Sequence, residues 1–145
     1  MYPIMTDEQW IVVGTDFSDG SQEALERGLR LAHDSRSNLA LVHADEDEVG
    51  SEVTAESTSP LLEQLVEEIA VSSAARRGIY VEPLVRRGPP WEVISTVARE
   101  YRADLVVVGA TGQRGVTRGI PLGSVASRLL ALSMCSVVVA RAPAR

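Results

Sequence analysis

A glycine-rich run between an apolar segment and a predicted helix is the part of this sequence best suited to chemistry. It has the pattern Gly109-x2-Gly112-x10-Gly123-Ser124. It follows segment 105–108, which is typical of a buried strand, and precedes segment 125–132, which is typical of a helix. Glycine lets a ligand approach the main chain closely, and a helix N-terminus offers unpaired N–H groups with a partial positive charge. The run therefore predicts a binding site for an anion, most often a phosphate.

Two common phosphate-binding motifs are excluded by the residues present. A P-loop needs a lysine after its second glycine, and all 14 basic residues of this chain are arginine. The dinucleotide fingerprint needs three glycines within one tight turn, which this spacing does not give. A glycine-rich segment alone can also be a simple connection, so its place between a strand and a helix carries the functional interpretation.

An aspartate that directly follows another predicted strand is the second candidate. Asp16 comes after the apolar segment 10–15 and before a predicted helix over 21–33, which Ser18 or Asp19 can cap. Open α/β sheets bind ligands at the carboxyl ends of their strands, so Asp16 lies where a ligand is expected. The alternative is a loop carboxylate that accepts hydrogen bonds from nearby N–H groups.

Strands and helices that alternate along the whole chain must position these residues. The apolar segments predict strands over 10–15, 38–43, 79–86, 105–108 and 136–140, and the periodic segments predict helices over 21–33, 61–77, 91–101 and from Ser124. The near-continuous apolar strands fit parallel strands that are covered on both faces. The sequence therefore predicts an α/β fold with one doubly wound, five-stranded parallel sheet. Pro83 donates no hydrogen bond, which places its strand near a sheet edge.

Length and charge limit the function classes. The 145 residues fit one domain, and the net charge is −6. Segment 45–60 holds six acids and no arginine, so the rest of the chain has 14 acids and 14 arginines and is neutral. We interpret this acidic segment as a mobile connection. Nucleic-acid binding is not expected without a basic face. No signal peptide or membrane span is predicted, and the single Cys135 forms no internal disulfide, which favours the cytosol.

Other chemically capable residues have simpler interpretations. His43 ends a predicted strand, but no cysteine or histidine gives it the spacing of a metal site. Trp91 is interpreted as a core residue and Cys135 as a small buried hydrophobe. There is no Gly-x-Ser-x-Gly motif, no lysine and no evident general base, so fast hydrolysis is not expected.

Five segments in order along residues 10–142 resemble the universal stress protein family. They are Val-Gly-Thr-Asp-Phe-Ser at 13–18, Leu-Val-His-Ala at 41–44, Ala-Asp-Leu-Val-Val-Val-Gly at 103–109, the glycine-rich run, and Ser-Val-Val-Val-Ala-Arg at 136–141. The usual loop of the ATP-binding members is Gly-x2-Gly-x9-Gly-Ser/Thr, one residue shorter than here. The extra residue, near Gly119-Ile120-Pro121, leaves both loop ends intact; it could bulge outward or widen the loop and shift the nucleotide preference.

The resemblance implies a Rossmann-like sheet of strand order 3-2-1-4-5, which brings Asp16 and Gly109 to one crevice. By similarity, the bottom of an adenosine pocket would be formed by Gly14, Thr15 and Asp16. One side of the pocket, next to the adenine, would be formed by Val42. The ribose and the first phosphate would lie against Gly109 and Gly112. Val108, which directly precedes Gly109, would also belong to the nucleotide-binding residues. The remaining phosphates would meet N–H groups and the hydroxyl at the start of the last helix, in the residues Gly123, Ser124, Val125 and Ala126.

Two arginines of the loop, Arg114 and Arg118, could pair with the outer phosphates through their forked guanidinium groups. This inference comes from charge and position, not from the family. The alternative is a pair of solvated loop arginines.

The resemblance implies a cytosolic ATP-binding protein of one domain over residues 1–145 that acts as a stress-response regulatory module, with Mg²⁺ bridging the phosphates. It is not expected to be an enzyme. The alternatives are a family member that binds no nucleotide and works through protein contacts, and a slow ATPase.

A homodimer through Ser136 to Ala140 is also expected. Val137-Val138-Val139 forms an uninterrupted apolar edge, and family members commonly dimerise through this strand. The alternative is an edge covered by the chain's own terminus.

Overall fold

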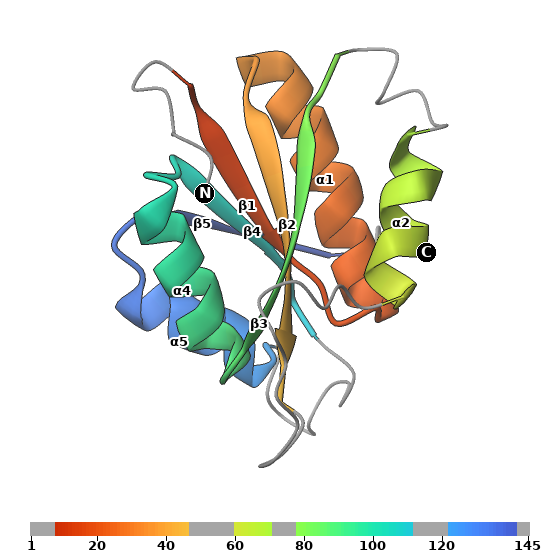
Figure 1. The fold of residues 1–145 in the computed structure, drawn as a ribbon. Coiled ribbons are helices and arrows are strands. Elements are labelled where there is room, and N and C mark those ends of the chain that lie inside the picture. Colours follow the sequence, from red (N-terminus) through yellow and green to blue (C-terminus); the bar gives the residue numbers. More distant parts are fainter. Residues whose placement is uncertain (1–7, 47–59, 71–77, 112–121, 142–145) are drawn as a thin grey trace.

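The computed structural model describes residues 8–46, 60–70, 78–111 and 122–141. Its centre is a sheet of five parallel strands in the order β3-β2-β1-β4-β5 (Figure 1). The strands are β1 (Trp10–Gly14), β2 (Asn38–Asp45), β3 (Val81–Arg87), β4 (Leu105–Gly109) and β5 (Ser136–Ala140). The predicted doubly wound sheet and its 3-2-1-4-5 order are confirmed.

Helices cover both faces of this sheet. They are α1 (Asp19–Ser35), α2 (Pro60–Ala70), α4 (Pro90–Glu100) and α5 (Ser124–Leu132). Figure 1 shows α4 and α5 on one face and α1 and α2 on the other. The predicted helix over 61–77 is described only as far as Ala70, because 71–77 lie outside the described residues. No helix in the described ranges is long and apolar enough to cross a membrane.

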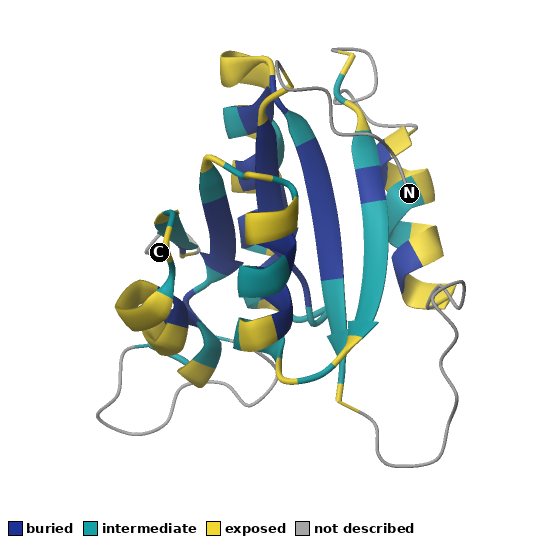
Figure 2. Ribbon diagram, turned by 60° about the vertical axis from the view of Figure 1, so that its left-hand side comes forward, coloured by how far each residue is buried: buried dark blue, intermediate teal, exposed yellow. Residues whose placement is uncertain are grey.

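Two apolar layers hold the helices to the sheet. Alternate residues of each strand point to opposite faces, so neighbouring residues of one strand enter different layers. Val12 and Val106 pack toward α4 and α5, whereas Val13 and Val107 pack toward α1 and α2, and all four are fully buried. Figure 2 shows the buried residues gathered in the middle strands of the sheet. These strands are therefore fixed from both sides, which makes their ends a firm base for a site.

Helix α1 has a defined cap at each end. At its start, Ser18 Oγ accepts a hydrogen bond from the Ser21 N–H at 3.3 Å, so Ser18 is the cap. At its end, Arg36 adopts a left-handed conformation with φ 55° and donates its N–H to the carbonyls of Ala32 and His33. Glycine usually fills this position because a side chain is unfavourable there.

We predict that Arg36→Gly stabilises the protein by about 0.5–1 kcal/mol, because glycine adopts positive φ without strain. Arg36 is exposed, so little packing is lost. Urea unfolding measures the change. The matched control is Arg30→Gly within α1, which is expected to destabilise by about 1 kcal/mol. A destabilising Arg36→Gly would contradict the prediction.

Side chains of the edge strand β3 bind it to α4 and to the residue that follows α4. Pro83 lies in this edge strand, as predicted, and Glu82 beside it is 8% exposed. The Tyr101 hydroxyl donates a hydrogen bond to Glu82, and the Tyr101 ring packs edge-on against Trp10 at 4.8 Å between centroids. Arg86 adds an ion pair to Glu100 of α4 at 2.7 Å. Burial first, and then the charge of Glu82 and this hydrogen bond, raise the pKa of Tyr101 to about 12.

We predict that one of the three tyrosines ionises near pH 12 in the folded protein. Because the folded-state pKa lies above the usual value of about 10, the stability that Tyr101 contributes is complete below pH 10 and is lost toward pH 12. Ultraviolet titration should lose this late transition in Tyr101→Phe. The variant should also be about 1–3 kcal/mol less stable at neutral pH, because Glu82 loses a donor. A titration near pH 10 for all tyrosines would contradict the prediction.

Candidate functional site

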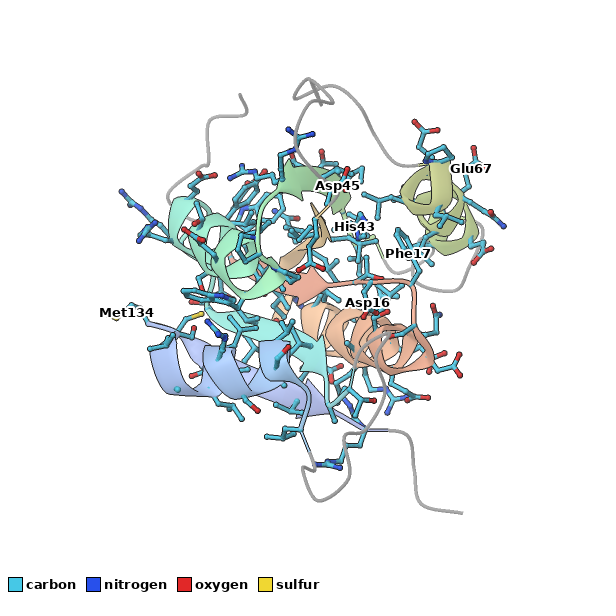
Figure 3. All side chains as sticks on the ribbon, turned by 90° about the horizontal axis from the view of Figure 1, so that it is seen from below. Asp16, Phe17, His43, Asp45, Glu67 and Met134 are labelled. Carbon is cyan, nitrogen blue, oxygen red and sulfur yellow. The ribbon has the colours of Figure 1, made fainter. Side chains whose placement is uncertain are left out.

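The carboxyl ends of β1 and β4 meet at one edge of the sheet. The two strands pair in parallel with Val13 opposite Val107, so the residues that follow each strand emerge side by side. The chain leaves β1 for α1 on one face and leaves β4 toward α5 on the other. Figure 3 looks onto this edge and labels Asp16 there. The expectation that Asp16 and Gly109 share one edge agrees with this arrangement.

The turn between β1 and α1 is held by a closed network of hydroxyl groups. Thr15 Oγ1 donates to Ser21 Oγ at 3.1 Å and accepts from the Phe17 N–H at 3.1 Å. Ser21 Oγ in turn donates to the Ser18 carbonyl at 2.9 Å. Thr15 and Ser21 are both buried. The Thr15 hydroxyl is therefore committed to the fold. So is its main chain, because the Thr15 N–H donates to the Val42 carbonyl at 2.8 Å and the Thr15 carbonyl lies 3.0 Å from His43 Nδ1.

Asp16 has a structural role of the kind that the alternative interpretation predicts. Its Oδ1 accepts from the Ser18 N–H at 3.0 Å and from the Ser18 hydroxyl in a shorter bond. The residue is half-buried. The carboxylate thus orients the residue that caps α1, and it does so at the edge where a ligand would enter.

Phe17 and His43 form a contact at this edge that the sequence did not indicate. The Phe17 backbone is left-handed with φ 64°, an uncommon conformation for a bulky residue, and its ring lies 4.7 Å from the His43 ring (Figure 3). His43 Nδ1 lies 3.0 Å from the Thr15 carbonyl, which can only accept, so Nδ1 carries the proton. The described residues contain no group of three or more side chains suited to bind a metal.

The glycines at this edge are required by close packing. A Cβ on Gly109 would lie 2.5 Å from the main-chain carbon and oxygen of Gly20 in α1, and a Cβ on Gly20 would meet the Thr111 carbonyl. A Cβ on Gly14 would lie 2.6 Å from Ile94 Cδ1 of α4. Gly20 was missed from the sequence, because its small size matters only through this tertiary contact.

Main-chain bonds join the two ends of the glycine-rich run. The Ala110 N–H donates to the Ala140 carbonyl of β5 at 3.0 Å, and the Gly123 N–H donates to the Ala110 carbonyl at 2.6 Å. The expectation that Gly123 offers its N–H to a phosphate is thereby corrected, since that group is used within the fold. Gly112, Arg114, Arg118 and the extra residue near Gly119 to Pro121 lie outside the described residues.

The start of α5 has no cap from any side chain in the described part of the chain. Gly123 is the cap residue, with extended backbone (φ −69°, ψ 168°) and no side-chain cap bond, and the first turn contains no acid. Ser124 is exposed and Val125 is half-buried, whereas Ala126 is 1% exposed and packs in the core. The hydroxyl of Ser124 and the first N–H groups of α5 can therefore meet a negatively charged group.

Val42 and Val108 do not reach this edge with their side chains. They are 1% and 4% exposed and pack in the layer beneath α4 and α5. β2 runs to Asp45, two residues beyond the predicted end, so Val42 lies further from the end of its strand than expected. Ala44, two residues further along the same strand face, is half-buried at the rim.

Comparisons with known proteins match almost the whole chain. The model of the Universal stress protein family matches residues 9–141. "Universal stress protein YxiE" of Bacillus subtilis is 29% identical over 148 residues, covering 90% of this chain and 97% of that protein.

Two solved structures extend the comparison. A universal stress protein in complex with cAMP is 26% identical, has a TM-score of 0.70 and covers 93% of this chain and 98% of its own. A universal stress protein family protein from Arabidopsis thaliana with AMP bound is 18% identical, which shows the fold alone; its TM-score is 0.61, with 94% and 93% of the two chains covered. With its sheet order, its glycine-rich run and the family match over residues 9–141, this chain belongs to the universal stress protein family.

Proposed function

We propose that this protein binds an adenine nucleotide, preferably ATP, at the carboxyl edge of β1 and β4. The observation that carries the proposal is the N-terminus of α5, which no described side chain caps and which a main-chain bond from Gly123 to Ala110 ties to the end of β4. The family supports it, and so does the 26% identical universal stress protein that was solved in complex with cAMP.

Different residues at this edge would contact different parts of the nucleotide. Gly14, Thr15 and Asp16 would pack against the adenosine, and β2 would lie beside the base through Val42 or Ala44. Gly109 and Gly112 would lie near the ribose and the first phosphate, and the Ser124 hydroxyl and the N–H groups at the start of α5 would bind phosphate oxygens.

A magnesium ion would be held mainly by the nucleotide. The described residues contain no metal-binding cluster, and Mg²⁺ commonly keeps several waters and binds through substrate phosphates. It would reduce the negative charge of the phosphates, while the protein's own groups orient them.

We propose a regulatory role in which nucleotide occupancy is read by other proteins. The described edge brings no lysine, nucleophile–base pair or metal cluster to the phosphates, which favours binding over rapid chemistry. A slow ATPase is the enzyme alternative, and steady release of inorganic phosphate in excess of the protein would support it.

We predict that calorimetry detects an adenine nucleotide with a Kd on the order of micromolar, roughly −8 kcal/mol. Gly123→Val should weaken the binding to about millimolar or beyond, because branched methyl groups would fill the space in front of the α5 N–H groups. The backbone at Gly123 (φ −69°, ψ 168°) is accessible to valine, so the fold should persist.

The matched control is Ala131→Val, which adds the same methyl groups at an exposed position near the other end of α5. It should bind like the wild type. Circular dichroism must show native secondary structure in both variants. No heat and no thermal shift with ATP, ADP, AMP or cAMP would refute the nucleotide proposal, and unchanged affinity in folded Gly123→Val would place the phosphates elsewhere.

We also propose a homodimer through β5. The two edges of the sheet differ: β3 carries Pro83 and the inward-pointing Glu82, whereas Val137, Val138 and Val139 of β5 are half-buried and carry no charge. Charges and prolines protect edges from pairing, so β5 is the edge suited to pair with a second copy. Antiparallel pairing of two β5 strands would give a two-fold interface.

We predict that Val139→Pro gives a folded monomer. The Ala140 carbonyl points toward β4, where it accepts from Ala110, so the alternation of the strand directs the Val139 N–H to the open edge. Light scattering at micromolar concentration should show a dimer for the wild type and a monomer for the variant. Val138→Pro is the contrast, since it removes an N–H that faces β4 and should destabilise the fold itself. A monomeric wild type would refute the proposal.

A further inference from the structure

Arg128 of α5 lies over the indole ring of Trp91, the second residue of α4. The guanidinium carbon is 5.5 Å from the ring centroid, within the range of a cation–π contact. Trp91 is half-buried and packs on the same apolar layer as Ala44 and Val125, while Arg128 is exposed. The contact therefore joins the middle of α5 to the first turn of α4.

The position of Arg128 on α5 directs it toward the N-terminus of that helix. Arg128 follows Ser124 by four residues, so the two lie on the same face, one turn and about 6 Å apart along the axis. Helical side chains lean toward the N-terminus and cover the preceding turn. An arginine is long enough to cover that turn, so its guanidinium can reach the level of the Ser124 hydroxyl.

The charges on the C-terminal part of the chain, which includes Arg128, favour an anionic ligand, and the acid next to Trp91 in the sequence is Glu92 of α4. All 20 acids of the chain precede Leu105, and residues 105–145 carry five arginines and no acid. Within the described residues Arg128 has no carboxylate partner, and the first turn of α5 holds no acid. A cation near a helix N-terminus is repelled by the helix dipole. The cation–π contact with Trp91 holds the guanidinium group of Arg128 without using its N–H groups, which stay available to donate hydrogen bonds to a ligand.

We propose that Arg128 is a specificity-determining residue that binds the outer phosphates of the nucleotide, and that Trp91 is its positioning residue. This inference rests on the proposed nucleotide site. The guanidinium fork matches the oxygens of a phosphate group, and its charge favours a triphosphate over a monophosphate. Arg128 thus makes the site select for the length of the phosphate chain, while the residues after β1 and β4 bind the nucleoside.

The test compares ATP and AMP in calorimetric titrations of the full chain at low and moderate ionic strength. Arg128→Gln should weaken ATP roughly tenfold, and AMP by less than about twofold. The ATP loss should shrink as salt is added, because salt screens exposed charges. The matched control is Arg30→Gln, which removes the same charge from an exposed site on α1 and should leave both affinities unchanged.

The positioning role of Trp91 must be tested by a measurement that a purely structural effect of the ring would not change. Trp91→Leu should lower the ATP affinity in the wild type and should have no further effect on it in the Arg128→Gln background. Trp91→Phe keeps an aromatic face and should retain most of the ATP preference. Equal effects of Trp91→Leu in both backgrounds would show that the ring acts only through stability, and would overturn its positioning role.

The outcomes separate this inference from the proposed function. An unchanged ATP-to-AMP affinity ratio in Arg128→Gln, with both ligands still bound, overturns the inference and leaves the proposed function intact. An equal loss of affinity for ATP and AMP also overturns it, because a residue that binds only the outer phosphates should not affect the binding of AMP. A wild type that binds neither nucleotide overturns the proposed function and this inference together.

Discussion

The close approach of α1 to the end of β4 is the constraint on which the candidate site depends. Gly20 and Gly109 face each other with no side chain between them, and any Cβ at either position would collide with main-chain atoms. The contact brings the turn after β1 and the start of the glycine-rich run to one edge. Glycines that look like ligand-binding residues are thus required first by packing, and a ligand would use an edge that the fold has already built.

The same edge is stiffened by main-chain bonds centred on Ala110. This residue donates to Ala140 of β5 and accepts from Gly123 at the start of α5. One residue therefore joins an edge strand, both ends of the glycine-rich run and the helix whose N-terminus no described side chain caps. These bonds hold the start of α5 in place, so its first N–H groups lose little further freedom when a ligand binds, which favours affinity without rearrangement.

The sequence predicted the features that depend on local pattern, and failed where tertiary contacts decide. The alternation of apolar segments predicted the five strands, Pro83 indicated an edge, and Ser18 was one of two possible caps. The strand over 38–43 was placed two residues short, and the Val42 side chain, which the resemblance placed beside the base, is buried in the core. The need for glycine at Gly20 and the use of the Gly123 N–H arise from contacts between elements distant in the chain.

The distribution of charge explains how an acidic protein could attract an anionic ligand. With a net charge of −6, the molecule as a whole repels phosphates, but at physiological ionic strength charges are screened beyond about 8 Å. What matters is therefore the local environment. All 20 acids come before Leu105, so β4, α5 and β5 contribute no carboxylate, and α5 contributes one arginine, Arg128. A phosphate at the start of α5 would meet the helix dipole and the guanidinium of Arg128, and Asp16, the acid that follows β1 at this edge, is already bonded to Ser18.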